Sequence, residues 1–385
     1  MNINKIIDLH RYAYKNKTSL RIFILFFYAC FLLLFKKYKT NQNSSLYGQL
    51  NNKFLFYKSM HRVDYDKLFD SITDVCEASK VILKSNIIYG FDFSFLKNIS
   101  NDWKYLKLID ANSIIERLYL FCSYLFYKKM LGNIRKYEFD YLVVFADMQP
   151  VENFIVQYFI EKGKKTVTLQ HGLFLEHGWN SNLNEINYTN IVSEYFLTWG
   201  NENKKLIEKY NKDVNVVVCG NPIIEPVEKA FDETKSKFFT VMFDSNLWHD
   251  YNQRMFDIAT CISKSTGYKI NIRFHPANKP EDYQIDKKYI INDVSLNYYN
   301  SEFILGHTSS MIHVCMRQGL VVFKMVSDMP HSYIDSKFYF SDCENILEKV
   351  GHLDDYKEVD YNHIEYIAEE SLLHYKLFFS GLLLK

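Results

Sequence analysis

The chain has 385 residues, which is enough for two domains that each bury a core of their own. Its 46 Lys and Arg residues balance 45 Asp and Glu residues, giving a formal net charge of +1. This balance argues against a nucleic-acid partner, and any attraction to an anion has to be local. The seven cysteines form no CxxC pair and lie in apolar segments, so we expect reduced thiols in a cytosolic protein.

The first 80 residues predict helices and loops, with the Asn-rich residues 41–52 as a loop. Residues 22–35 (IFILFFYACFLLLF) carry no charge and lie between Arg21 and the pair Lys36-Lys37. This stretch is shorter than the ~20 residues of a standard membrane span, and no signal-peptide cleavage site follows it. Three interpretations stay open: a buried helix, a helix lying on a membrane surface with basic flanks, and a true span.

From residue 80 onward, apolar β-branched runs alternate with helical patterns, which predicts parallel sheets. We expect strands at residues 81–83, 87–89, 141–145, 166–169, 196–200, 214–219, 238–243, 268–274, 303–305 and 321–325. We expect helices at residues 114–130, 150–162, 202–210, 249–265, 309–318 and near the C-terminus, where residues 375–385 are apolar. The charged residues 223–237, which include Pro226, predict a boundary between domains 1–225 and 226–385.

A first candidate site follows the predicted strand 166–169, where the sequence reads Gln170-His171-Gly172. A histidine at the carboxyl end of a parallel strand is well placed to act as a general base. Glu176 and His177 follow in a polar stretch that we expect to be a long loop without regular structure, and such loops are often functional. The alternative is that His171 is a core histidine bonded to backbone.

A second candidate site is the turn Arg273-Phe274-His275-Pro276, at the end of the predicted strand 268–274. Arginine offers a planar fork of donors for phosphate, and histidine can donate as well. Strand alternation predicts that Arg273 and His275 lie on one face. The alternative is a solvated arginine at a surface strand end.

A third candidate site is the run Gly306-His307-Thr308-Ser309-Ser310, which leads into a predicted helix. Hydroxyl groups and the backbone N–H groups at the start of a helix together favour an anion. The alternative is an ordinary helix cap, since Ser and Thr are preferred there in any case. Asp244 and Asn246, at the end of the predicted strand 238–243, are further candidates for contact with a ligand.

These three motifs resemble those of bacterial surface-polysaccharide transferases of the GT-B type, which include Kdo transferases, polysialyltransferases and CDP-glycerol glycerophosphotransferases. The resemblance covers residues 141–325. It implies two Rossmann-like α/β domains with a central cleft, an N-terminal acceptor-side domain and a C-terminal domain that binds a nucleotide donor. It also implies His171 as the base, and Arg273, His275, Ser309 and Ser310, with Thr308, around the donor phosphates. Gly172, Glu176, His177, Asp244, Asn246 and His307 are further cleft residues.

The sequence departs from that family in the predicted helix 309–318. Many such enzymes have a glutamate there that holds the donor ribose, whereas this helix has no acid. His313 or Arg317 could replace it, so the nucleotide stays open, with CMP- or CDP-linked donors among the options. The triplet Asp64-Tyr65-Asp66 resembles a metal-binding DxD, but it does not end an apolar strand, and we interpret it as the solvated start of a helix. We therefore expect no catalytic metal and no other cofactor, and no Walker or GxGxxG motif is present.

The predicted function is that of an inverting, metal-independent glycosyltransferase. It would move a sugar from a nucleotide-activated donor to a glycan or lipid-linked acceptor in capsule or O-antigen synthesis. Two alternatives stay open, a polyol-phosphate transferase that uses a CDP donor and a non-catalytic sugar- or nucleotide-binding protein. The two apolar segments with basic flanks suit a cytoplasmic protein that contacts the inner membrane face peripherally.

Overall fold

The computed structural model describes residues 1–14, 17–43, 53–91, 93, 95, 99–174, 176, 181–227, 237–275, 278–291, 297–327, 334–357 and 363–384. The chain divides into two compact units. Unit 1 comprises Met1–His171, Asn180–Ile223 and Glu369–Lys385, and unit 2 comprises Gly172–Trp179 and Ile224–Ala368. Relative to the sequence-based division, residues 172–179 and 224–225 fall in unit 2, and the final helix from Glu369 onward falls in unit 1.

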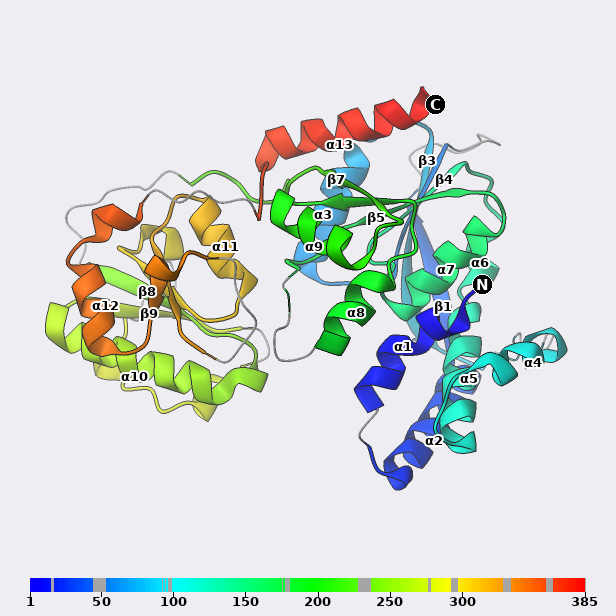
Figure 1. The fold of residues 1–385 in the computed structure, drawn as a ribbon, viewed down its shortest axis with the longest axis horizontal. Coiled ribbons are helices and arrows are strands. Elements are labelled where there is room, and N and C mark those ends of the chain that lie inside the picture. The colour runs from blue at the N-terminus through cyan, green and yellow to red at the C-terminus, as the bar shows by residue number, and fades with distance from the viewer. Residues whose placement is uncertain are drawn as a thin grey trace. The chain divides into compact units, whose positions relative to one another are not determined.

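Unit 1 is built on a seven-stranded sheet with the strand order β1-β3-β2-β4-β5-β6-β7 (Figure 1). All neighbouring strands are parallel except β1, which pairs antiparallel with β3 at one edge. The strands are β1 (Lys36–Asn43), β2 (Phe54–Lys58), β3 (Lys80–Tyr89), β4 (Tyr141–Val144), β5 (Lys165–Leu169), β6 (Tyr195–Thr198) and β7 (Asn215–Val218). Strands β2 and β4 are buried along their whole length, as expected for central strands covered on both faces.

Helices pack on both faces of this sheet. On one face, Leu55 and Tyr57 of β2 join a core that draws side chains from α1, α2, α5 and α7. On the other face, Phe54 and Phe56 contact rings of α3 and α13. The helices are α1 (Ile3–Tyr14), α2 (Ser19–Phe35), α3 (Val63–Asp74), α4 (Ile99–Leu108), α5 (Ile114–Lys128), α6 (Leu131–Ile134), α7 (Pro150–Ile160), α8 (Ser181–Thr189), α9 (Asn201–Tyr210) and α13 (Ala368–Leu383).

The apolar segment 22–35 belongs to helix α2, which is apolar on all sides and buried on one side only. Ala29 and Leu33 are buried, whereas the side chains on the opposite side are exposed. Within the described part of the chain, no helix is both long and apolar enough to cross a membrane. The expected loop 41–52 is wrong for residues 41–43, which belong to β1, and residues 44–52 lie outside the described residues. The two strands expected at 81–83 and 87–89 are one strand, β3.

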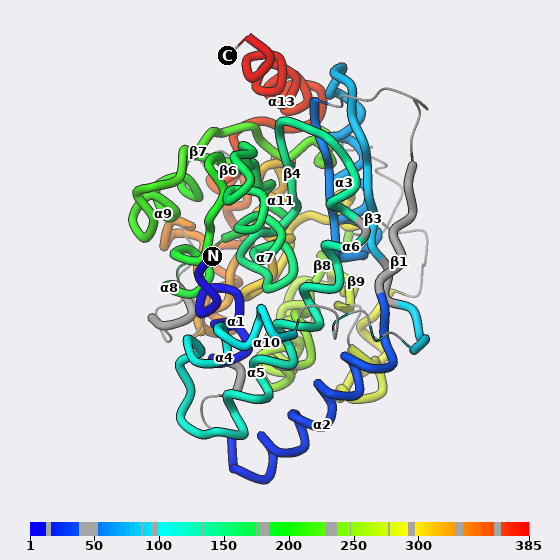
Figure 2. Tube along the Cα trace, turned by 90° about the vertical axis from the view of Figure 1, so that its right-hand side faces the viewer, coloured from blue at the N-terminus to red at the C-terminus, as the bar shows by residue number. Residues whose placement is uncertain are grey.

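Helix α13 packs on unit 1 through its buried side. The hydroxyl of Ser371 donates to the carbonyl of Cys219 (2.8 Å), and that of Tyr375 donates to the carbonyl of Gly220 (3.2 Å). Phe379 is buried against Phe54 and Phe56 of β2. Helices α13 and α2 lie at opposite ends of unit 1 (Figures 1 and 2).

Unit 2 contains a five-stranded parallel sheet with the order β12-β11-β10-β8-β9. Side chains from α10 and α12 form one core against this sheet, and side chains from α11 form another. Helix α10 ends at Gly267, whose φ of 76° is in the left-handed region that favours glycine. The elements are β8 (Phe238–Met242), α10 (His249–Thr266), β9 (Lys269–Arg273), β10 (Ile304–Gly306), α11 (Ser310–Arg317), β11 (Val322–Met325), β12 (Tyr339–Phe340) and α12 (Cys343–Val350).

The expectation of reduced cysteines is wrong for one pair. Cys261 of α10 and Cys343 of α12 form a disulfide, with their Cα atoms 6.2 Å apart. The pair is separated by 82 residues, so no local spacing in the sequence could reveal it. The bond joins two helices that already pack together on one face of the sheet of unit 2.

Candidate functional site

Each unit carries a cluster of polar side chains at the carboxyl ends of its parallel strands. In unit 1 the cluster is organised by Glu152, a fully buried residue in the first turn of α7. Its Oε1 accepts from the backbone N–H (2.9 Å) and the hydroxyl (2.7 Å) of Ser59, which follows β2. Its Oε2 accepts from the N–H of Ala146, which follows β4. One carboxylate thus joins the loops after two neighbouring strands.

His171 follows β5 and is held by the residue before it. Gln170 is fully buried, and its N–H donates to the carbonyl of Leu197 in β6 (2.9 Å). Its Oε1 accepts from the hydroxyl of Thr198 (2.6 Å) and from the N–H of Trp199 (2.8 Å). The backbone that carries His171 is therefore fixed between the ends of β5 and β6.

Two aromatic rings and a cation surround the half-buried imidazole of His171. Its ring lies 5.7 Å from the ring of Tyr65, edge to face, and 5.8 Å from the ring of Phe145. The guanidinium of Arg62 lies over the same Tyr65 ring at 3.9 Å. Burial, followed by the charge of Arg62, lowers the pKa of His171 to about 4. At neutral pH this imidazole is uncharged, which is the state that a general base requires.

The acids of the Asp64-Tyr65-Asp66 triplet lie in the first turn of α3, the helix start that the sequence predicted. Asp64 pairs with Arg62, and Asp66 pairs with Lys58, which is fully buried at the end of β2. Burial lowers the pKa of Lys58, and its ammonium also lies over the rings of Phe69 (5.1 Å) and Phe145 (5.6 Å). In the described residues, no three His, Cys, Asp or Glu side chains are grouped as metal ligands.

The segment after His171 differs from the long irregular loop expected from the sequence. Residues 181–189 form helix α8. Gly172 and Glu176 are half-buried and belong to unit 2, whereas His177 lies outside the described residues. Helix α8 was missed because its sequence, SNLNEINYT, is rich in Asn and has no clear apolar periodicity.

In unit 2 the corresponding cluster is organised by Asp244, which follows β8, the strand between β10 and β9. Its Oδ2 accepts from the N–H (2.9 Å) and the hydroxyl of Thr308, which follows β10. Its backbone carbonyl accepts from Asn278 Nδ2 (2.8 Å) in the loop after β9. Asp244 therefore links the loops after three neighbouring strands, and both donors of Thr308 point to it.

His307 is fully buried beside Asp244. Its Nε2 lies 3.0 Å from Asn252 Oδ1, and its Nδ1 lies 3.3 Å from Asp244 Oδ2. The same Asn252 of α10 accepts from the Asp244 N–H (2.9 Å) and donates to the Asp244 carbonyl (3.0 Å). Burial lowers the pKa of His307 more than the charge of Asp244 raises it. His307 is therefore a neutral part of the loop framework.

Ser309 is the N-cap of α11, where its hydroxyl accepts from the N–H of Met311 (3.3 Å). Ser310 begins the helix and is exposed. Helix α11 packs closely against the end of the sheet. A Cβ atom at Gly306 would collide with Ile312 Cγ2. Glycine at 306 thus places the start of α11 directly at the end of β10.

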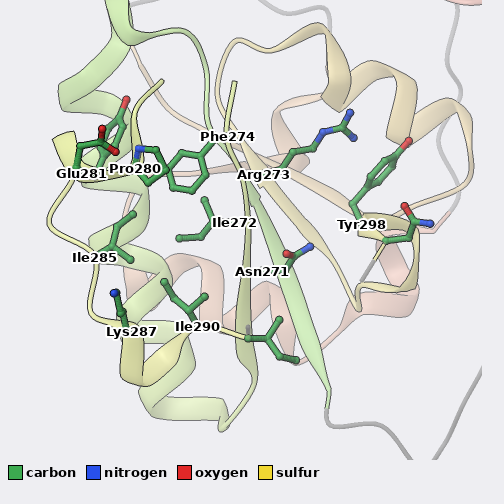
Figure 3. A pocket seen from close by; sticks show the side chains of 13 residues that line it. Asn271, Ile272, Arg273, Phe274, Pro280, Glu281, Ile285, Lys287, Ile290 and Tyr298 are labelled. Carbon is green, nitrogen blue, oxygen red and sulfur yellow. The ribbon is translucent and has the colours of Figure 1, made fainter. Parts of the chain in front are cut away.

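Arg273 and Tyr298 line a pocket of about 950 Å³ that extends along β9, the edge strand (Figure 3). The guanidinium of Arg273 lies over the Tyr298 ring at 4.7 Å, and the Tyr298 hydroxyl donates to Gln318 at the end of α11 (3.3 Å). His275 follows in the turn, where its carbonyl accepts from the N–H of Asn278 (2.9 Å). Pro276 lies outside the described residues, and Asn246 is exposed in a 3-10 turn before α10.

Sequence reasoning did not identify Glu152, Arg62, Tyr65, Asn252 or Tyr298. Glu152 had a detectable signal, because it is the only acid within the largely apolar helix PVENFIVQYFI. Arg62 and Tyr65 had none, since they are remote from His171 in sequence and only the pairing of β2 with β4 and β4 with β5 brings these segments to one edge. Asn252 and Tyr298 likewise depend on contacts between distant segments.

Comparison with known proteins places the fold. No protein-family model matches the chain, and no curated protein is similar to it in sequence. Among solved structures it is similar to UDP-GlcNAc 2-epimerase from Methanocaldococcus jannaschii (TM-score 0.52, 14% identity, 86% of this chain and 100% of that chain). It is also similar to S. aureus MnaA with UDP (0.53, 10%, 86% and 97%) and to a putative UDP-N-acetylglucosamine 2-epimerase from Listeria monocytogenes (0.53, 12%, 85% and 95%).

At such low sequence identities, the similarity to these solved structures is evidence for the fold alone. The chain is an α/β protein of two Rossmann-like units, and its fold is of the GT-B type. The predicted fold class is thereby confirmed.

Proposed function

We propose that this protein is an enzyme acting on a nucleotide-activated sugar, and specifically an inverting, metal-independent glycosyltransferase. Its acceptor would be a glycan or a lipid-linked glycan in bacterial capsule or O-antigen synthesis. The observation that carries the proposal is the arrangement in unit 2. There, loops after three neighbouring parallel strands are joined at Asp244, and one of them leads directly into the Ser309-capped helix α11. This is the part of an open α/β sheet where phosphorylated ligands bind.

On the donor side, Arg273, His275 and the Ser309-Ser310 start of α11 would bind the nucleotide phosphates. A guanidinium fork and a helix N-terminus both stabilise the negative charge that grows on a departing phosphate. Both donors of Thr308 are bonded to Asp244, so we assign Thr308 the task of holding the loop rather than of binding phosphate. Asp244 and His307 would act in the same positioning role.

On the acceptor side, His171 would take the proton of the attacking hydroxyl. The hydroxyl oxygen then bonds to the anomeric carbon as the bond to the nucleotide phosphate breaks, which inverts the configuration. The rings of Tyr65 and Phe145 beside His171 keep the imidazole neutral and poorly solvated. An anionic substrate close to Arg62 would offset the positive charge that lowers the His171 pKa, and would make the imidazole a stronger base.

Two other activities are candidates. A CDP-polyol donor would give a phosphodiester rather than a glycosidic bond, in line with the resemblance to CDP-glycerol glycerophosphotransferases. Two of the solved structures of similar fold are UDP-GlcNAc 2-epimerases, one of them putative, which makes interconversion of a free nucleotide sugar a second candidate.

The experiment is a screen of CMP, CDP, UDP and GDP by thermal shift, followed by incubation of the responding nucleotide's sugars with acceptor glycans. A ligand that binds only the native state raises the unfolding temperature. We expect one nucleotide to respond and its sugar to be transferred with a new glycosidic bond. A phosphodiester product would favour the polyol-phosphate activity, and a change of the sugar without an acceptor would favour epimerisation. Nucleotide binding without any turnover would indicate a non-catalytic binding protein.

A further inference from the structure

The outer face of α2 is an uncovered apolar surface. Its side chains are between 43% and 69% exposed, although all of them are large and apolar. They recur at spacings of three and four residues, which places them on one side of the helix. We call this surface the α2 face; it consists of Leu20, Phe23, Ile24, Phe27, Tyr28 and Phe31.

The opposite side of α2 is firmly attached to unit 1. Ala29 and Leu33 are buried in the same core as residues of α5, and Cys30 contacts Cys122 of α5 with their sulfur atoms 3.9 Å apart. Lys129, at the end of α5, donates to the carbonyls of Leu33 and Lys36 (3.1 Å for the latter). The α2 face is therefore held outward on a rigid support.

The charged residues that flank α2 along the chain have one sign. The exposed side chains of Lys17 and Arg21 lie at the start of the helix, and Lys36 and Lys37 follow its end. The sequence contains no acidic residue between Asp8 and Asp64. An apolar surface between cations complements a layer that is apolar inside and negatively charged at its surface.

We propose that the α2 face binds the surface of an anionic phospholipid bilayer, with the helix lying in the plane of the membrane. The 17-residue helix is about 25 Å long, shorter than the ~30 Å hydrocarbon layer, and its other side is already buried in protein. Aromatic side chains such as Phe23, Phe27 and Tyr28 are suited to the boundary between headgroups and acyl chains. This inference does not depend on the proposed enzymatic activity.

Exposed apolar side chains alone do not identify a membrane-binding surface, as helix α13 shows. Leu373 and Leu377 are also exposed, but Glu369 and Glu370 begin that helix and Lys376 is paired with Glu77. Because α13 and α2 lie at opposite ends of unit 1, one flat bilayer cannot contact both (Figures 1 and 2). Charge complementarity selects α2, and α13 supplies a matched control.

The test is cosedimentation of the full chain with vesicles of phosphatidylcholine, with or without phosphatidylglycerol. We expect binding that is stronger with phosphatidylglycerol. The double variant F23S/F27S should lower the partition constant about ten-fold or more, since two exposed aromatic side chains lose their apolar contact. The variant K17E/K37E should lose most of the preference for phosphatidylglycerol. The control L373S/L377S should bind as the wild type does.

Three results would overturn the proposal. The wild type could fail to bind either kind of vesicle, or L373S/L377S could reduce binding as much as F23S/F27S. Sedimentation velocity without lipid could instead show a dimer that F23S/F27S dissociates, in which case the α2 face binds a second copy of the chain. Unchanged thermal unfolding of F23S/F27S would show that the variant is folded, as expected for exposed positions.

Discussion

In both units a carboxylate links the loops at the carboxyl ends of the strands, but the other side chains at these strand ends differ. In unit 1, buried Glu152 accepts three hydrogen bonds from the loops after β2 and β4. In unit 2, Asp244 links the loops after β10, β8 and β9. The strand ends of unit 1 also carry His171, with its lowered pKa, next to two aromatic rings, whereas those of unit 2 carry a capped helix start and the exposed Arg273.

Under the proposed function, this difference corresponds to a division of chemical work. A neutral, partly buried imidazole is suited to proton transfer, and a helix N-terminus with a guanidinium is suited to phosphate. We assign both carboxylates a framework role, since both oxygens of Glu152 and Oδ2 of Asp244 accept from backbone and hydroxyl donors. Variants at the two kinds of position should therefore have separable effects on turnover, binding and stability.

The largest expected effect is that of H171A on turnover. Loss of a general base should lower kcat by roughly 10²- to 10⁴-fold, while the dissociation constant of the donor nucleotide stays within about two-fold of the wild type. Assays with a labelled donor, including single-turnover assays, measure the loss of turnover, and titration calorimetry measures the dissociation constant of the nucleotide. The matched variant Y65F keeps the ring beside His171 and should be close to the wild type. A kcat of H171A within ten-fold of the wild type would remove His171 from the base role.

Next in size is the loss of stability in E152A. Truncation leaves the buried N–H of Ala146 and the half-buried donors of Ser59 without their acceptor, so the free energy of unfolding should fall by roughly 2–5 kcal/mol. Urea denaturation followed by circular dichroism measures this change. The variant E152Q tests the two loops separately. Its amide oxygen can still accept from Ser59, but its N–H₂ group faces the N–H of Ala146 and cannot accept from it. If E152A were as stable as the wild type, the carboxylate would not be the link between the two loops.

A smaller effect is expected for R273A on nucleotide affinity. Loss of a charge-assisted contact to phosphate should weaken binding of the responding nucleotide about 10- to 100-fold, with little change in stability because Arg273 is exposed. R273K keeps the charge but loses the planar fork, so its affinity should lie between those of R273A and the wild type. Equal nucleotide affinity in all three proteins would place the phosphate elsewhere.

The smallest expected effect is that of mild acid on the activity. Burial and Arg62 lower the pKa of His171 to about 4, so the base stays deprotonated as the pH falls through the ordinary histidine value of 6.5. The kcat/KM profile should therefore show no descending acid limb near pH 6.5. Stability behaves differently. Below pH 6.5 the unfolded chain binds protons that folded His171 and His10 exclude, so the free energy of unfolding decreases as the pH is lowered. An acid limb centred at the ordinary value would show that the imidazole is not desolvated.

Much of the fold was readable from the sequence because its central strands are buried on both faces and therefore appear as continuous apolar runs. Strands β4, β5, β8 and β11 belong to this group. Strand β1 could not be read, since its sequence KKYKTNQN is polar and its extension depends on antiparallel pairing with β3 at the sheet edge. The site motifs were readable as strand ends, but their partners Glu152, Arg62 and Asn252 depend on which strands are neighbours.

One measurement tests the division of work most directly: the nucleotide dissociation constant, determined by titration calorimetry in the wild type, R273A and H171A under one set of conditions. The account predicts that a nucleotide binds to the wild type, that R273A weakens it about 10- to 100-fold, and that H171A leaves it unchanged. The absence of any nucleotide binding to the wild type would contradict the account. So would a loss of affinity in H171A equal to that in R273A.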